Sequence, residues 1–169
     1  MTMRLIALVR DGSGAAAAEM ALVLPLLLTI MYGSLELGNY FMNEHSLVKA
    51  VRDGARFAAR QSFTNYTGCS GNVGEPAYTS TKNVVMNGYL TGGTLVTPNV
   101  TTADIGVTTS CKTTAGGQTM SGIYTGRANG AQIVTVSALV TYKPVIGFFG
   151  VSTGSMKLSA RSEAAVAGM

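Results

Sequence analysis

The chain has 169 residues. A long apolar run near the start takes up part of this length and leaves room for only one small domain. Its net charge of +4 is spread along the sequence without a block of like charges, which excludes the basic patch of a typical nucleic-acid-binding protein. One histidine, His45, and two well-separated cysteines fit no catalytic triad, zinc motif or C-x-x-C redox motif, so no metal, cofactor or enzymatic role is predicted.

Residues 1–14 are expected to form a short leader on the cytoplasmic side of a membrane. The segment carries Arg4 and Arg10, and a run of alanines precedes the apolar stretch. A secretory signal peptide has the opposite order, with small residues at a cleavage site after its apolar region. The apolar stretch is therefore predicted to remain in the protein as an anchor.

Residues 15–37 are predicted to form a transmembrane helix. No Asp, Glu, Lys or Arg lies between Glu19 and Glu36, and most positions there are Leu, Ile, Val, Met or Ala. On a helix these two carboxyl groups are roughly 25 Å apart, slightly less than the roughly 30 Å apolar thickness of a bilayer. A carboxyl group near each boundary is tolerable, whereas one at the midplane would be costly.

Glu19 follows Ala15 by one helical turn, so the two residues share a helix face. Cleavage after Gly14 would make Ala15 the new amino terminus, with the Glu19 carboxylate within reach of its ammonium group. The same pair could form between subunits, because an unpaired carboxylate in a low dielectric is costly. The alternative is a glutamate at the membrane edge whose carboxylate reaches water.

Pro25 lies inside the apolar run, where it removes one backbone donor and crowds the carbonyl of Ala21. We expect a bend or a loosened turn there, and neighbouring helices could cover the exposed carbonyl. The alternative is a membrane proline that is merely tolerated. Glu36, at the other boundary, is the second residue predicted to take part in transmembrane packing.

Residues 38–61 are predicted to continue the helix as a stem outside the membrane. Apolar residues recur at helical spacing and can pack on a soluble domain: Leu37, Phe41, Val48, Val51, Ala55 and Ala58. The opposite face is polar and largely basic: Asn43, Lys49, Arg52, Arg56 and Arg60. Gly54 destabilises the stem by about 1 kcal/mol relative to alanine, which predicts either a close backbone approach or a flexible point there.

Two stretches of the sequence resemble known protein families. A basic leader, Gly14, AAAAE and ALVLPLLL together are similar to the processing site of type IV prepilins, which a prepilin peptidase cuts after the glycine. The longer run RDGSGAAAAEMALVLPLLLTIMYGSLELGNYF, followed by AVRDGARFAA, resembles the TadE family of pseudopilins from tight adherence pilus systems. The resemblance extends to about Ala59. It implies cleavage between Gly14 and Ala15 and a role for Glu19 in subunit assembly.

Residues 62–169 are expected to form a β-rich extracytoplasmic domain. After a glycine-rich loop over residues 62–79, a short helix is predicted that Ser80 or Thr81 caps and the Gly92–Gly93 pair ends.

Strands are predicted for the rest of this domain. The expected segments are a strand, a turn and a strand over 97–111, an exposed hairpin loop over 113–130, and strands over 133–142 and 156–165. In the third strand one face is apolar: Val134, Val136, Ala138, Val140 and Tyr142. The predicted fold class is α+β, with the long helix packed on a small antiparallel sheet as in pilins.

Cys69 and Cys111 both lie beyond the apolar run, and a disulfide between them is predicted. Such a bond implies an oxidising compartment. The chain-entropy model gives it a stabilising effect of roughly 4 kcal/mol. Two buried free thiols are the alternative.

The sequence is interpreted as a minor pseudopilin of a tight adherence pilus, cleaved after Gly14 and acting in pilus assembly or priming. The implied partners are a prepilin peptidase, other pilus subunits, the inner-membrane assembly platform and membrane lipid. Basic residues flank the apolar run on both sides, so their count does not fix its orientation. The short leader and the cysteines favour a single-pass protein of the bacterial inner membrane with a cytoplasmic amino terminus. The alternative is an uncleaved, TadG-like envelope scaffold or binding module.

Overall fold

The computed structural model describes residues 13–66, 68–69, 71, 73–115, 118–119, 121–127, 129–145, 147 and 156–168. Most of the predicted leader, residues 1–12, lies outside these described residues. The chain divides into two compact units, Met1–Asn39 and Tyr40–Met169.

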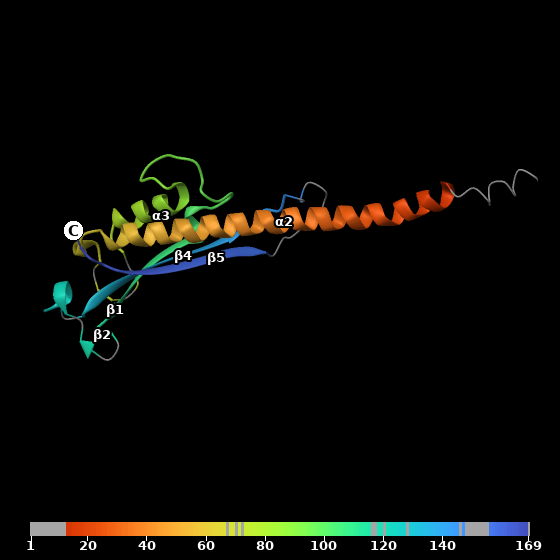
Figure 1. Ribbon diagram of the computed structural model, residues 1–169. Helices are drawn as coiled ribbons and strands as arrows, with labels where there is room; N and C mark the ends of the chain where they lie inside the picture. Colours follow the sequence, from red (N-terminus) through yellow and green to blue (C-terminus); the bar gives the residue numbers. More distant parts are fainter. Residues whose placement is uncertain are drawn as a thin grey trace, which may run out of the picture. The chain divides into compact units, whose positions relative to one another are not determined.

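Helix α2 (Ser13–Ala59) is one continuous element that includes both the predicted transmembrane helix and the predicted stem (Figure 1). It passes through Pro25 and Gly54 without a break and ends two residues before the predicted boundary at Gln61. The predicted α+β class with a long amino-terminal helix is therefore confirmed.

The sheet has three antiparallel strands in the order β1 (Ile105–Lys112), β4 (Ala131–Thr141) and β5 (Lys157–Ala165). Strand β4 is central and pairs with both neighbours, for example through Val136, which lies opposite Val107 and Ser162. The predicted apolar face of β4 is confirmed, because its residues are buried: Val134, Val136, Ala138, Val140 and Tyr142.

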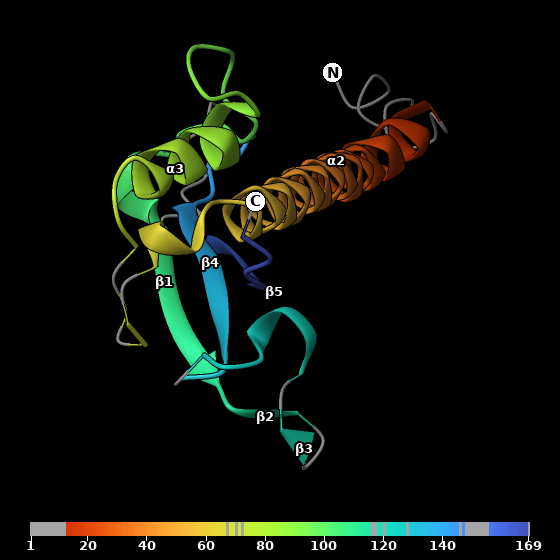
Figure 2. The same ribbon diagram turned by 90° about the vertical axis from the view of Figure 1, so that its left-hand side faces the viewer.

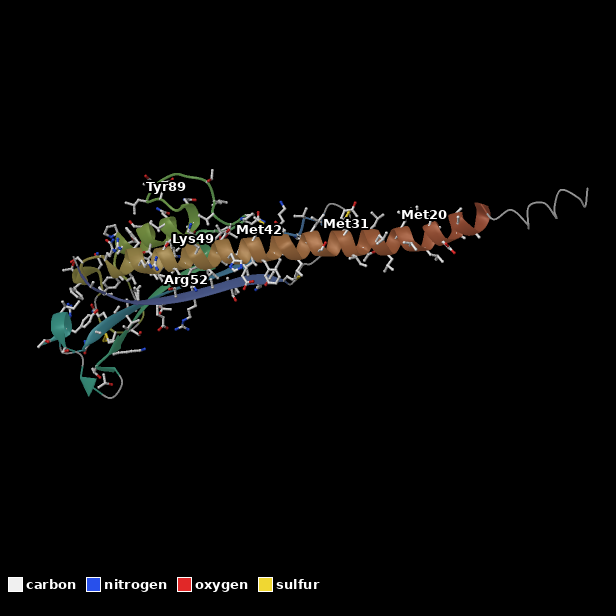
Figure 3. The ribbon with its side chains drawn as sticks, viewed as in Figure 1. Met20, Met31, Met42, Lys49, Arg52 and Tyr89 are labelled. Carbon is white, nitrogen blue, oxygen red and sulfur yellow. A yellow bond between two sulfur atoms is a disulfide. The ribbon has the colours of Figure 1, made fainter. Side chains whose placement is uncertain are left out.

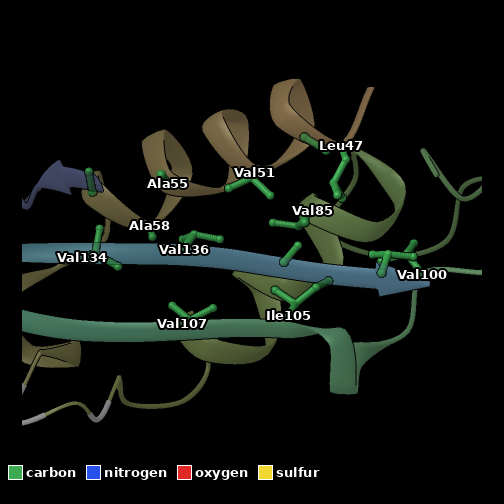
Figure 4. Close-up of a cluster of buried hydrophobic side chains, with 14 of the residues drawn as sticks. Leu47, Val51, Ala55, Ala58, Val85, Val100, Ile105, Val107, Val134 and Val136 are labelled. Carbon is green, nitrogen blue, oxygen red and sulfur yellow. The ribbon is translucent and has the colours of Figure 1, made fainter. Parts of the chain in front are cut away.

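The core lies between this face of the sheet and the carboxyl-terminal part of α2, with α3 (Ala77–Asn87) completing the helical layer (Figures 2 and 4). The core side chains of α2 are small or branched: Leu47, Ala50, Val51, Ala55, Ala58 and Ala59. The predicted stripe is wrong at Phe41, whose side chain is 48% exposed. Tyr40 makes the contact instead, with its ring edge-on to that of Tyr142 at a centroid distance of 5.2 Å.

Gly54 is the point at which α3 packs against α2. A Cβ atom added there would overlap Cγ2 of Val85 and would lie 3.7 Å from the carbonyl oxygen of Thr81. Of the two alternatives for this glycine, close approach of a neighbouring element is thus the one that the structure supports.

Helix α3 begins and ends earlier than predicted. Its amino-terminal turn is held by Glu75, whose carboxylate accepts hydrogen bonds from the backbone N–H and the hydroxyl of Thr79 at 3.2 and 2.8 Å. Thr81 is therefore interior and buried, and its hydroxyl donates to the carbonyl of Ala77. Gly88 ends the helix in the left-handed region at φ 74°, so the chain turns away before the predicted Gly92–Gly93 stop.

The strand predicted before β1 is absent from the described residues. Thr97 to Val100 form a turn in which Asn99 has φ 62°, and η2 (Thr102–Asp104) follows it. Asp104 accepts from the backbone N–H and the hydroxyl of Thr101, and this local bonding competes with strand pairing.

The predicted hairpin loop contains two short paired strands, β2 (Thr114–Ala115) and β3 (Gln118–Thr119), followed by η3 (Gly122–Tyr124). Before α3, η1 (Phe63–Asn65) leads into the loop that carries Cys69. Cys69 and Cys111 are bonded, with their Cα atoms 5.0 Å apart, so the predicted disulfide is present and ties this loop to β1.

Tyr66 is a core residue that the sequence analysis missed. It is 2% exposed, its hydroxyl donates to the carbonyl of Ala58, and its own carbonyl accepts from Nε2 of Gln132 at 2.6 Å. Burial raises the pKa of Tyr66 to about 12, so the phenol keeps its donor proton further into alkaline pH than an exposed tyrosine does. Tyr66 therefore links the end of α2 to strand β4.

Gly54→Ala should destabilise the protein. Overpacking against Val85 costs about 1–3 kcal/mol, which exceeds the gain of about 1 kcal/mol in helix propensity. Urea unfolding of the detergent-solubilised protein measures the difference. Gly38→Ala is the matched control, because a Cβ there meets nothing within 4 Å, and it should be neutral or stabilising. Equal stability of Gly54→Ala and the natural protein would contradict this packing.

Candidate functional site

The candidate functional site is the apolar segment, residues 15–37 of α2. Among the described residues, α2 is the one helix that is long and apolar enough to cross a membrane, and its most apolar stretch is 0% buried (Figure 3). Large apolar side chains are exposed all along it: Met20, Leu22, Val23, Leu24, Leu26, Leu27, Leu28, Ile30, Met31 and Leu35. An apolar surface of this extent is characteristic of a lipid or protein contact.

The two aliphatic hydroxyl groups within the apolar segment bond to its own backbone. Thr29 Oγ1 donates to the carbonyl of Pro25 at 2.7 Å, and Ser34 Oγ donates to the carbonyl of Met31 at 2.8 Å. A hydrocarbon solvent offers no hydrogen bonds, so polar groups there need internal partners. The segment is thus compatible with a single-pass membrane anchor.

Gly14, Ala15 and Glu19 lie in the first turns of α2 and are exposed. A Cβ atom added at Gly14 would meet no atom of the described residues within 4 Å, so their packing does not require glycine there. The two ion pairs formed by the described residues, Asp53–Arg56 and Arg161–Glu163, do not include Glu19. In the uncut chain the nitrogen of Ala15 is a peptide nitrogen and carries no charge.

Pro25 and Glu36 share a helix face with two residues that the sequence analysis did not single out. Thr29 follows Pro25 by four residues, Tyr32 follows by three more, and Glu36 by another four. At about 100° of rotation per residue, Glu19 lies about 100° around the helix axis from Glu36 and therefore on a different face. The two carboxyl groups of the segment therefore lie on different faces of the helix. The 4-3-4 spacing from Pro25 to Glu36 is the sequence signal that places Thr29 and Tyr32 on the face of Glu36.

Comparison with known proteins gives one match. Residues 14–56 match the family of TadE-like proteins, whereas no curated protein and no solved structure matches the chain. The matched region begins at Gly14 and covers the apolar segment and most of the stem, but not the sheet. The resemblance to the TadE family is confirmed, and the chain carries a TadE-like domain at residues 14–56. The prepilin-like processing site stays a prediction.

Proposed function

We propose that this protein is a minor pseudopilin of a tight adherence pilus system, anchored in the bacterial inner membrane and cut by a prepilin peptidase after Gly14. One observation carries the proposal: the TadE-like match starts at Gly14 and coincides with a helix whose apolar surface is exposed. The protein acts as a substrate of the peptidase and as a scaffold in pilus assembly or priming, not as an enzyme.

The local structure supports access to the bond between Gly14 and Ala15. Gly14 and the alanines that follow it are small and exposed, so the neighbouring side chains of α2 do not cover the bond. Cleavage would create an ammonium group at Ala15, one turn from the Glu19 carboxylate. At about 5 Å and an effective dielectric constant of about 20, their attraction is roughly 3 kcal/mol. The positive end of the helix dipole also attracts the carboxylate, although it repels the ammonium group.

The disulfide supports an extracytoplasmic location for the sheet domain. Cys69 and Cys111 are bonded, and disulfides persist in oxidising compartments such as the periplasm. With the domain on that side, the amino terminus would face the cytoplasm. The partners would be the peptidase, membrane lipid, other pilus subunits and the assembly platform of the inner membrane.

Leu28→Lys should reduce membrane integration. A lysine near the centre of a transmembrane helix costs about 2.5–3.5 kcal/mol on insertion scales. The fraction of protein that resists alkaline extraction from membranes measures this effect. Met42→Lys, at a 73% exposed position of α2 beyond the apolar segment, should leave the fraction unchanged. Recovery of the natural protein in buffer without detergent would contradict an anchor.

The mature protein should begin at Ala15, and Gly14→Lys should leave the precursor uncut. Intact mass and amino-terminal peptides of membrane-extracted protein measure both. Gly33→Ala, at a second glycine with open space around it, should be cut normally. An intact Met1 or Thr2 in the natural protein would instead favour the uncleaved, TadG-like scaffold.

Glu19→Ala should spare cleavage but lower co-purification with other pilus subunits, because the ammonium group at Ala15 then lacks its carboxylate. Glu19→Gln should behave like Glu19→Ala, since the charge and not the shape matters. Glu44→Ala, outside the apolar segment, is the control. Unchanged co-purification of both Glu19 variants would rule out an assembly role for this residue.

A further inference from the structure

The loop after α3 presents apolar side chains to solvent. This apolar loop, residues 88–96, stands out beyond α3 in Figures 1 and 2. Four of its side chains are exposed, namely Tyr89 at 66%, Leu90 at 51%, Leu95 at 47% and Val96 at 37%. Grouped apolar side chains on a surface are typical of a protein contact.

Specific contacts hold the apolar loop in place. The backbone N–H of Val96 donates to the carbonyl of Met86 at 2.8 Å, and Nδ2 of Asn83 donates to the carbonyl of Leu90 at 2.9 Å. Gly93 has φ 94°, and a Cβ there would lie 2.8 Å from Cδ2 of Tyr89, so the ring packs on this glycine. The loop is ordered although its apolar side chains face outward, which lowers the entropic cost of binding a partner.

A hollow of about 190 Å³ lies beside the apolar loop, between α2 and α3. It is lined by Lys49, Ala50, Asp53, Val84, Gly88 and Val96. Its apolar lining can take one aliphatic or aromatic side chain, while its charged residues, Lys49 and Asp53, come from α2. The hollow and the loop share Gly88 and Val96, so they form one surface.

The charge beside the hollow is positive. Asp53 is paired with Arg56, with Oδ1 and Nη1 3.9 Å apart. Lys49 and Arg52 are exposed, and in the part of the chain that the structure describes neither has a carboxylate partner (Figure 3). A partner that fits this surface therefore brings a carboxylate to Lys49.

We propose that the apolar loop and the hollow dock a segment of a different protein, which places an apolar side chain in the hollow and an adjacent Asp or Glu against Lys49. A second copy whose two-fold axis passes through this surface would set Lys49 and Arg52 against the same cations, which disfavours that mode of self-association. All residues of this surface, Lys49 included, lie beyond Gly14 in the sequence and stay in the chain after a cut there, so the inference holds whether or not that cut occurs.

Photo-crosslinking in intact cells of the native organism tests this proposal with the full chain. A benzoylphenylalanine at position 89 should cross-link to a different protein, at a peptide with an apolar residue beside Asp or Glu. The same probe at Ile123, which is 60% exposed on η3, should not. Lys49→Glu should reduce the yield about tenfold, since like charges then oppose each other. Lys112→Glu, at an exposed lysine of β1, should not.

Charge reversal identifies the contact. Changing the carboxylate of the partner to lysine should restore cross-linking to the Lys49→Glu variant. Leu90→Ser should reduce the yield without changing the melting temperature, because the side chain is half exposed. Cross-linking to a second copy, to lipid or to nothing would overturn the proposal, as would a yield that Lys49→Glu leaves unchanged. Amino-terminal peptides from the same cells report cleavage separately. Failure of the proposed function can therefore be told apart from failure of this docking proposal.

Discussion

Helix α2 has to satisfy two different surroundings along one unbroken backbone. In its first half the apolar side chains are long and exposed, as at Leu24 and Ile30, whereas in its second half small side chains such as Ala55 and Ala58 are buried. Long side chains can fill the space among acyl chains, and small ones let a sheet and a second helix come close. The change from exposed to buried apolar side chains along α2 is thus the constraint on which both the proposed anchor and the domain depend.

The sheet domain is fixed to the end of this helix by several short-range ties. The hydroxyl of Tyr66 donates to the carbonyl of Ala58, and the backbone N–H of Ala167 donates to the carbonyl of Ala59 at 2.7 Å. The last turn of a helix leaves carbonyls without partners in the helix. Here the carbonyl of Ala59 accepts from Ala167, and that of Ala58 accepts both from Tyr66 and from the backbone N–H of Gln61 at 3.0 Å. The end of α2 is therefore capped by the domain, and the disulfide holds the intervening loop to β1.

Much of this arrangement could be predicted from local pattern. Alternation identified the buried face of β4, and the uncharged run identified the apolar segment. The misses were set by local hydrogen bonds of side chains: Glu75 starts α3 early, and Asp104 bonds to Thr101 where a strand was expected. Periodicity also predicted a core contact at Phe41, which is exposed. A periodic pattern shows which face of a helix is apolar, but it does not show at which residue the packing begins. Tyr66 sits in a loop, where no periodic signal marks burial.

Spin-label accessibility along α2 in membranes is the most direct measurement of the central claim, that one helix passes from lipid to protein. The native cysteines are bonded, so single cysteines at positions 28 and 56 can be labelled selectively. The account predicts that oxygen, which concentrates in lipid, relaxes the label at Leu28 more strongly, and that a water-soluble nickel complex relaxes the label at Arg56 more strongly. Equal access of the nickel complex to both positions would contradict it.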